Sequence, residues 1–195
     1  MDRNRILKSY YGFDTFKEGQ AEVIDSIMAG RDVMCIMPTG AGKSVCYQIP
    51  ALMQSGTTLV VSPLISLMKD QVSALSQMDI KAAYINSSMT SQEYGRTLSA
   101  MSRGLYRIVY VAPERLHSET FAEICRKIDI PFIAVDEAHC ISQWGQDFRP
   151  SYLRIVEFVR ELPGRPVIGA FTATATPDVK EDIKTLLELD DPFCI

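Results

Sequence analysis

The sequence predicts an α/β domain of three layers (αβα), in which a mostly parallel central sheet is covered by helices on both faces. Two observations predict it: short apolar runs typical of buried strands recur along the chain, and amphipathic stretches of about 10–15 residues separate them. This alternation is typical of βαβ units. The 195 residues, 47% of them hydrophobic, are enough for one core, and the sequence contains no repeat, low-complexity segment or linker. We therefore expect one domain.

The expected strands are residues 33–37, 57–62, 82–85, 107–111, 132–135 and 167–171. Short helices are expected around Ile6, Leu7 and Tyr10 and from Ala21 to Met28, the second stopping at Gly30. The longer helices are expected at residues 43–53, 64–78, 91–101, 118–127, 152–161 and 179–187. Pro50 is expected to bend the first of these, and Thr90 with Glu93 forms a capping-box pattern before the third.

The turn between the first strand and its helix predicts a phosphate-binding loop. After Met37 it reads Pro38, Thr39, Gly40, Ala41, Gly42, Lys43 and Ser44. Glycines let backbone N–H groups close around a phosphate, the lysine reaches the β- and γ-phosphates, and the serine hydroxyl can hold Mg²⁺. Met37 stands where the usual pattern has its first glycine, so a Gly-rich turn with a surface lysine is the alternative.

A second site is expected where the apolar run 132–135 ends in Asp136 and Glu137. In open α/β sheets, ligands bind at the carboxyl ends of the strands. A nucleotide loop needs a partner acid that organises Mg²⁺, here Asp136, and a second acid that orients or deprotonates the attacking water, here Glu137. The alternative is that the two acids only terminate a buried strand and cap a helix.

Taken together, these residues resemble the ordered motifs of superfamily 2 helicases of the DEAH type, specifically the RecQ DNA helicases. The resemblance covers the whole chain and is carried by residues 37–44, 62–71, 110–116, 136–139 and 172–176. Its most specific part is the segment 138–152, which resembles the aromatic-rich loop that distinguishes RecQ proteins from DEAD-box RNA helicases. The resemblance implies a RecA-like P-loop fold over residues 1–195, with adenine-recognition helices in residues 1–30.

The aromatic-rich segment also has a physical interpretation of its own. Trp144, Phe148 and Tyr152 recur every four residues, as in a helical core stripe, but Gly145 and Pro150 oppose one continuous helix. An irregular segment that presents aromatic rings suits single-stranded DNA, because bases stack on rings and arginine meets phosphate. The residues expected to bind DNA or to couple it to the nucleotide are His139, Gln143, Trp144, Gln146, Phe148, Arg149, Thr172 and Thr174. Gln146 stands where the family usually has histidine.

The resemblance further implies that Phe13, Lys17 and Gln20 recognise adenine. Gln20 can donate and accept hydrogen bonds at once, which matches the N6 donor and N7 acceptor of adenine. Lys17 departs from the family's usual arginine, and Ala41 replaces a glycine, which requires a negative φ there.

Thr172 to Thr176 resembles the stretch that relays the nucleotide state through contacts near His139, although threonine hydroxyls can equally cap the next helix. Lys69 and Arg115 are expected near the DNA, by resemblance, or else are solvated surface charges. The net charge of −4 comes from residues 178–191, which hold six acids against two lysines, so a local basic surface is allowed.

The implied cofactors are ATP and Mg²⁺, and the implied partners are single-stranded and partly duplex DNA and a second RecA-like lobe. The expected function is that of the first motor lobe of an ATP-dependent 3′-to-5′ DNA helicase, with little activity on its own because no second lobe, zinc module or winged helix is visible. An RNA-remodelling ATPase and a non-enzymatic nucleotide-binding module are the alternatives. Neither a secretory signal nor a membrane segment is seen, so we expect a cytoplasmic, nucleoid-associated protein of bacterial type with reduced cysteines.

Overall fold

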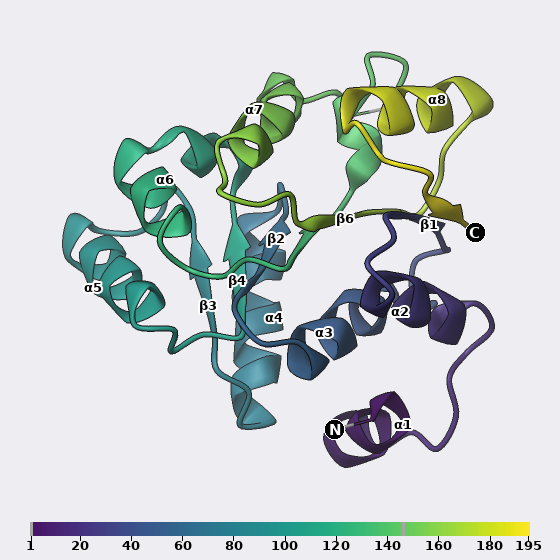
Figure 1. Ribbon diagram of the computed structural model, residues 1–195, viewed down its shortest axis with the longest axis horizontal. Coiled ribbons are helices and arrows are strands. Elements are labelled where there is room, and N and C mark those ends of the chain that lie inside the picture. Colours follow the sequence, from purple (N-terminus) through teal and green to yellow (C-terminus); the bar gives the residue numbers. More distant parts are fainter. Residues whose placement is uncertain (1, 146) are drawn as a thin grey trace.

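The computed structural model describes residues 2–145 and 147–195, which form one seven-stranded sheet between two layers of helices (Figure 1). The strands lie in the order β3-β4-β2-β5-β6-β1-β7, and each described pair is parallel. Their bounds are β1 Val33–Ile36, β2 Thr58–Val61, β3 Ala82–Ile85, β4 Ile108–Val111, β5 Phe132–Val135, β6 Val167–Thr172 and β7 Phe193–Cys194. The predicted α/β architecture and its six strands are confirmed.

The helices connect the strands in the expected alternation. Their bounds are α1 Arg3–Ile6, the π-helical η1 Leu7–Tyr11, α2 Gln20–Met28, α3 Lys43–Met53, α4 Ile65–Gln77, α5 Ser91–Ser102, α6 Glu119–Cys125, α7 Ile155–Arg160 and α8 Pro177–Leu186. Three 3₁₀ turns lie between them: η2 Pro113–His117, η3 Ala138–Ile141 and η4 Pro150–Arg154. No helix in the described part of the chain is both long and apolar enough to cross a membrane.

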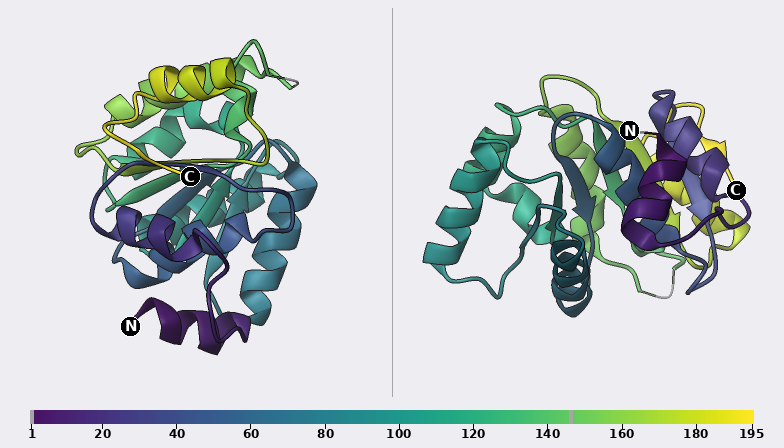
Figure 2. Two further views of the ribbon diagram at one scale, coloured as in Figure 1. Left: turned by 90° about the vertical axis from the view of Figure 1, so that its right-hand side faces the viewer. Right: turned by 90° about the horizontal axis from the view of Figure 1, so that it is seen from below.

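Each face of the sheet has its own core. On one face, Leu98 of α5, Phe121 of α6 and Phe158 of α7 pack with the strands and with α8. On the other face, Val23 of α2, Cys46 of α3 and Met68 of α4 pack against them. Figure 2 shows the resulting layers, with α8 above the sheet and α1 below it in the left-hand view. Residues buried on both faces explain why the strands read as unbroken apolar runs.

Two local predictions are confirmed. The Thr90 hydroxyl accepts from the Glu93 N–H at 3.2 Å, and the Glu93 carboxylate accepts from the Thr90 N–H at 2.8 Å, which completes the capping box of α5. The cysteines are free, and four of the five are buried. Pro50 lies inside α3, which continues to Met53.

Two elements differ from the sequence expectation. The helix expected over 152–161 begins only at Ile155, because Pro150 starts a 3₁₀ turn first and cannot donate a helical hydrogen bond. The short strand β7 was not expected. It is held to β1 by backbone hydrogen bonds from Phe193 N to Asp32 O (2.8 Å), Ile195 N to Met34 O (3.0 Å) and Ile36 N to Ile195 O (2.8 Å).

Asp32, at the start of β1, ties three distant segments together. Its buried carboxylate accepts hydrogen bonds from the Arg165 guanidinium at 3.1 and 2.5 Å, from Ile168 N at 2.8 Å and from Asp190 N at 2.8 Å. Removing it leaves buried donors without acceptors, and such a loss costs more than the bonds contribute. This carboxylate therefore fixes the amino-terminal edge of β1 and β6.

We predict that Asp32→Ala lowers the free energy of unfolding by about 2–4 kcal/mol, because it leaves backbone N–H groups and a partly buried guanidinium without their hydrogen-bond acceptor. The measurement is chemical denaturation of the 195-residue chain. The matched control is Glu157→Ala, which removes an exposed i,i+3 ion pair with Arg154 and should change the stability by less than about 0.5 kcal/mol. Equal effects of the two substitutions would contradict the anchoring role.

Candidate nucleotide and DNA site

The phosphate loop lies between β1 and α3, at the carboxyl edge of the sheet. Gly40 and Gly42 have φ values of 81° and 89°, which non-glycine residues adopt only with strain. The φ of Ala41 is not positive, and this is the condition under which alanine can replace glycine at this position. A Cβ at Gly42 would lie 2.5 Å from the Gln20 amide nitrogen, so a larger residue there would displace the Gln20 side chain.

This loop is held by two of the residues that were expected to recognise adenine. The Gln20 amide donates to Ala41 O at 3.2 Å and Gly42 O at 3.1 Å, and the Lys17 ammonium donates to Gly40 O at 3.0 Å. Gln20 is buried and its side-chain oxygen accepts from Lys17 N at 2.9 Å, which fixes the orientation of its amide. Phe13 is exposed. Their contact with adenine stays a prediction.

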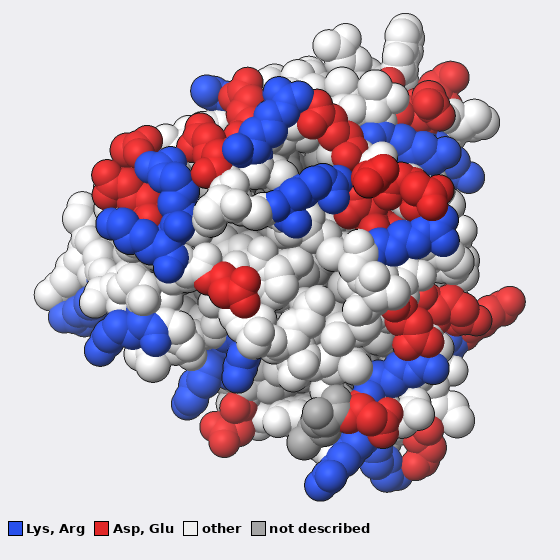
Figure 3. All heavy atoms as spheres, viewed as in Figure 1, with Lys and Arg blue, Asp and Glu red and all other residues white. Residues whose placement is uncertain are grey.

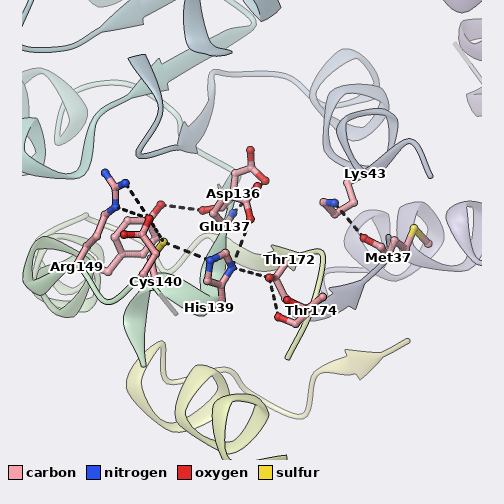
Figure 4. A network of polar contacts seen from close by, with 11 residues as sticks. Met37, Lys43, Asp136, Glu137, His139, Cys140, Arg149, Thr172 and Thr174 are labelled. Carbon is pink, nitrogen blue, oxygen red and sulfur yellow. Dashed lines mark hydrogen bonds and ion pairs between the residues drawn. The ribbon is translucent and has the colours of Figure 1, made fainter. Parts of the chain in front are cut away.

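Lys43 and Ser44 occupy the first turn of α3, with Gly42 as the N-cap. The Lys43 ammonium donates to Met37 O at 3.0 Å, and it faces Asp136 and Glu137, which follow β5, across the site (Figure 4). Pro38, Thr39 and Gly40 are exposed, whereas Ala41 to Ser44 are half-buried. The helix N-terminus and the lysine make this edge favourable for a phosphate group.

Asp136 is the buried member of the acidic pair. Burial raises the pKa of its carboxyl to about 6, and the neighbouring Glu137 carboxylate adds to the rise, whereas the Glu137 N–H and the Lys43 ammonium oppose it. The backbone of Asp136 is fixed on both sides, because its N–H donates to Val61 O at 2.8 Å and its carbonyl accepts from the Tyr152 hydroxyl at 2.8 Å. The sequence left Tyr152 open between core packing and contact with DNA. Its side chain is fully buried, which favours packing.

The chemistry of these groups fits Mg²⁺. The described residues contain no group of three or more histidine, cysteine or acidic side chains able to hold a metal ion. Mg²⁺ is commonly held by one or two carboxylates, a hydroxyl and the phosphates of its substrate rather than by a full protein cage. The Ser44 hydroxyl and the Asp136 carboxylate are the oxygen donors of that kind at this edge.

Glu137 is held in a strained conformation that aims its side chain at His139. Its φ of 49° and ψ of 45° lie in the left-handed region, which costs a non-glycine residue roughly 1–3 kcal/mol. His139 Nδ1 lies 3.4 Å from Glu137 Oε2 and 2.8 Å from Thr172 Oγ1, and the Thr172 hydroxyl donates to Thr174 O at 3.2 Å. The expected contact between the Thr172 stretch and His139 is confirmed. Thr176 also caps α8 through Val179 N, so the capping interpretation holds, and the relay of the nucleotide state stays a prediction.

The aromatic-rich segment is irregular, as Gly145 and Pro150 predicted. The Trp144 side chain is 76% exposed. The backbone N–H of Trp144 donates to the Ser142 hydroxyl at 3.1 Å, and that hydroxyl donates to Asp182 of α8 at 2.6 Å. A Cβ at Gly145 would lie 2.6 Å from His139 O. Gln143 is exposed and Phe148 is half-buried, whereas Gln146 lies outside the described residues. The loop therefore presents its tryptophan to solvent from a fixed base.

Arg149 connects this loop to two other parts of the site. Its guanidinium donates to the Asp147 carboxylate at 2.9 and 3.1 Å and to Pro63 O at 3.3 Å. The Cys140 thiol lies 3.8 Å both from Asp147 Oδ2 and from His139 Nε2. A chain of contacts thus runs from Arg149 through Asp147, Cys140 and His139 to Glu137 (Figure 4).

Sequence reasoning missed Asp147 and Cys140 as members of this chain of contacts. The only available signal was the position of Asp147 two residues before Arg149. Lys69 and Arg115 were placed near the DNA by resemblance, and their cationic groups lie over aromatic rings, at 5.9 Å from Tyr84 and 5.2 Å from Tyr94.

A cavity of about 380 Å³ lies beside the tryptophan. Its walls come from His139, Trp144 and Gly145 on one side and from residues 174–176 with Val179 on the other. On the face shown in Figure 3, basic and acidic side chains are interspersed.

Comparisons with known proteins agree with this geometry. The family model described as DEAD/DEAH box helicase matches residues 17–183. The chain is 56% identical over 179 residues to the ATP-dependent DNA helicase RecQ of Bacillus subtilis, covering 91% of this chain and 30% of that protein. It is 43% identical over 203 residues to the ATP-dependent DNA helicase Q5 of Mus musculus, covering 98% of this chain and 21% of that protein.

Among solved structures, the DUF1998 helicase MrfA bound to DNA and AMPPNP superposes with a TM-score of 0.77 at 21% identity, over 100% of this chain and 29% of that chain. This likeness supports the fold. The chain spans less than a third of the length of each relative named here. A family model that covers most of the chain, and a site in which a phosphate loop faces a strand ending in Asp-Glu-Ala-His, establish that the chain belongs to the DEAD/DEAH box helicases.

Proposed function

We propose that this chain is the first motor lobe of an ATP-dependent DNA helicase of the RecQ type, which couples ATP hydrolysis to 3′-to-5′ movement on single-stranded DNA and to duplex unwinding. The observation that carries the proposal is the unbroken chain of contacts from Glu137 through His139 to both the Thr172 stretch and the aromatic-rich loop. It joins the acid suited to activating water to the segment suited to binding bases. The RecQ relatives support the choice of DNA.

In the proposed reaction, Lys43 neutralises phosphate charge, and Ser44 and Asp136 hold Mg²⁺, which supplies Lewis-acid stabilisation of the phosphoryl oxygens. Glu137 orients the attacking water and accepts its proton. The left-handed backbone of Glu137 and its contact with His139 keep the carboxylate in one position, so it need not reorganise during the reaction. A second lobe closes the opposite side of the nucleotide and supplies the arginines that stabilise the developing charge, so this lobe alone hydrolyses ATP slowly.

On the DNA side, Trp144 offers an exposed ring on which bases stack, and Gln143 and Phe148 of the same loop are the further residues proposed to contact DNA. Arg149 is held between Asp147 and Pro63, at the foot of the loop. The cavity beside Trp144 joins this surface to the Thr172 stretch, which contacts His139 directly. Base stacking at Trp144 therefore has a short physical route to the acid that acts on water.

We predict that Glu137→Gln in the full-length protein lowers the kcat of DNA-stimulated ATP hydrolysis by at least about 100-fold, because the amide cannot accept the proton of the water. The affinity for a fluorescent ATP analogue should stay within about threefold, because phosphate binding depends on other groups. The matched control is Glu181→Gln on the exposed surface of α8, which should leave both quantities unchanged. Unchanged hydrolysis in Glu137→Gln would overturn the role of Glu137 in activating water, and no hydrolysis in the unmodified protein would favour the non-enzymatic alternative.

We predict that Trp144→Ala raises the single-stranded DNA concentration for half-maximal ATPase stimulation by about 10-fold or more, since each stacked base contributes roughly 1–3 kcal/mol. Hydrolysis without DNA should not change. Leu153→Ala, which also shortens an exposed apolar side chain close by in sequence, serves as the control and should leave the DNA response as it is. A stronger response to RNA than to DNA in the unmodified protein would contradict the choice of substrate.

A further inference from the structure

A buried network of polar side chains joins four elements on the face of the sheet that α3 and α4 cover. Gln48 of α3 is its centre: its amide donates to Gln71 Oε1 at 2.9 Å and to the Tyr110 hydroxyl at 2.9 Å, and its oxygen accepts from the Tyr11 hydroxyl at 2.9 Å. The Tyr110 hydroxyl also donates to Gln71 Oε1 at 3.4 Å. Gln71 belongs to α4, Tyr110 to β4 and Tyr11 to η1.

The centre of the network is buried, whereas Tyr11 and Gln71 at its ends are half-buried. Gln48 is 3% exposed and Tyr110 1% exposed. Burial raises the pKa of Tyr11 and of Tyr110 above the ordinary value for tyrosine, so both hydroxyls keep the proton that they donate. Buried polar side chains that are hydrogen-bonded to one another favour one arrangement of the elements that carry them, whereas apolar side chains would allow these elements to slide.

The elements joined by this network lead to different parts of the site. Helix α3 begins with Lys43 and Ser44, little more than one turn before Gln48. Helix α4 begins at Ile65, directly after Pro63 and Leu64, and the Pro63 carbonyl accepts from Arg149 of the aromatic-rich loop. The network therefore spans from the phosphate loop to the support of the DNA loop, without passing through His139.

We propose that Gln48 is a positioning residue that fixes α4 to α3, so that a displacement of the phosphate-loop helix is passed through α4 and Pro63 to Arg149 and the aromatic-rich loop. This inference rests on the proposed helicase function. Gln48 touches neither nucleotide nor DNA and acts through the two helices. The Gln48 network gives the lobe a second connection between the phosphate loop and the aromatic-rich loop, on the α3–α4 side of the sheet.

The test is Gln48→Leu in the full-length protein, with the ratio of DNA-stimulated to basal ATPase as the main measurement. We expect that ratio to fall about fivefold or more, the size typical of mutations that act on coupling, while basal hydrolysis and the affinity for an ATP analogue stay within about twofold. Tyr110→Phe removes a single hydroxyl and keeps the ring, so it provides a milder variant that folds if Gln48→Leu does not. Its ratio should fall in the same direction.

The matched control is Gln54→Leu, a substitution of the same type at the end of α3, outside the network. It should leave the ratio unchanged. The double variant Gln48→Leu with Gln71→Leu should be no worse than Gln48→Leu alone, because both break the same link.

Two outcomes separate this inference from the function on which it rests. If the unmodified protein shows no DNA-stimulated hydrolysis, the proposed function fails. If the unmodified protein is stimulated and both Gln48→Leu and Tyr110→Phe, folded as judged by circular dichroism, keep its ratio, only the positioning role is overturned. A fall of basal and stimulated rates by the same factor would also overturn it, since that is what a general loss of stability produces.

Discussion

The parallel pairing of β1, β6, β5 and β2 is the constraint on which the site depends. Pairing places Ile36 beside Thr172, Ala170 beside Val135, and Val135 beside Val61. Because all four strands run in one direction, their carboxyl ends meet at one edge, and the residues that follow them become neighbours. The phosphate loop, the acidic pair and the Thr172 stretch, which are far apart in sequence, are adjacent only for that reason. A strand of opposite direction at any of these positions would remove its residues from the site.

The sheet and the chemistry at its edge were predictable because each depends on local sequence. Buried parallel strands need apolar runs such as residues 132–135, and a phosphate loop needs glycines at positions such as Gly40 and Gly42, where φ is positive. The late start of α7 and the short strand β7 were harder to predict from the sequence. The first depends on the turn that Pro150 begins, and the second consists of two residues whose pairing is decided by distant Asp32 and Met34.

Side-chain contacts between distant segments were beyond the sequence. The approach of Cys140 to Asp147, the support of Asp136 by Tyr152 and the use of Gln20 to brace the phosphate loop all depend on how loops fold back over the edge. Residue type alone offers no way to choose a partner for them: a buried cysteine is usually a small hydrophobe, and a glutamine near a nucleotide has several possible partners. The family resemblance pointed to these loops, but the contacts between them come from the three-dimensional arrangement.

The short pairing of β7 with β1 also affects whether another chain can pair with the outer edge of β1. An outer strand with free N–H and C=O groups is a template onto which another chain can add, and β1 is apolar on both faces. Residues 193–195 occupy outward hydrogen-bonding groups of Asp32, Met34 and Ile36. These residues thus cover the outer edge of the strand that leads into the phosphate loop, so that edge is not open to pairing with another chain.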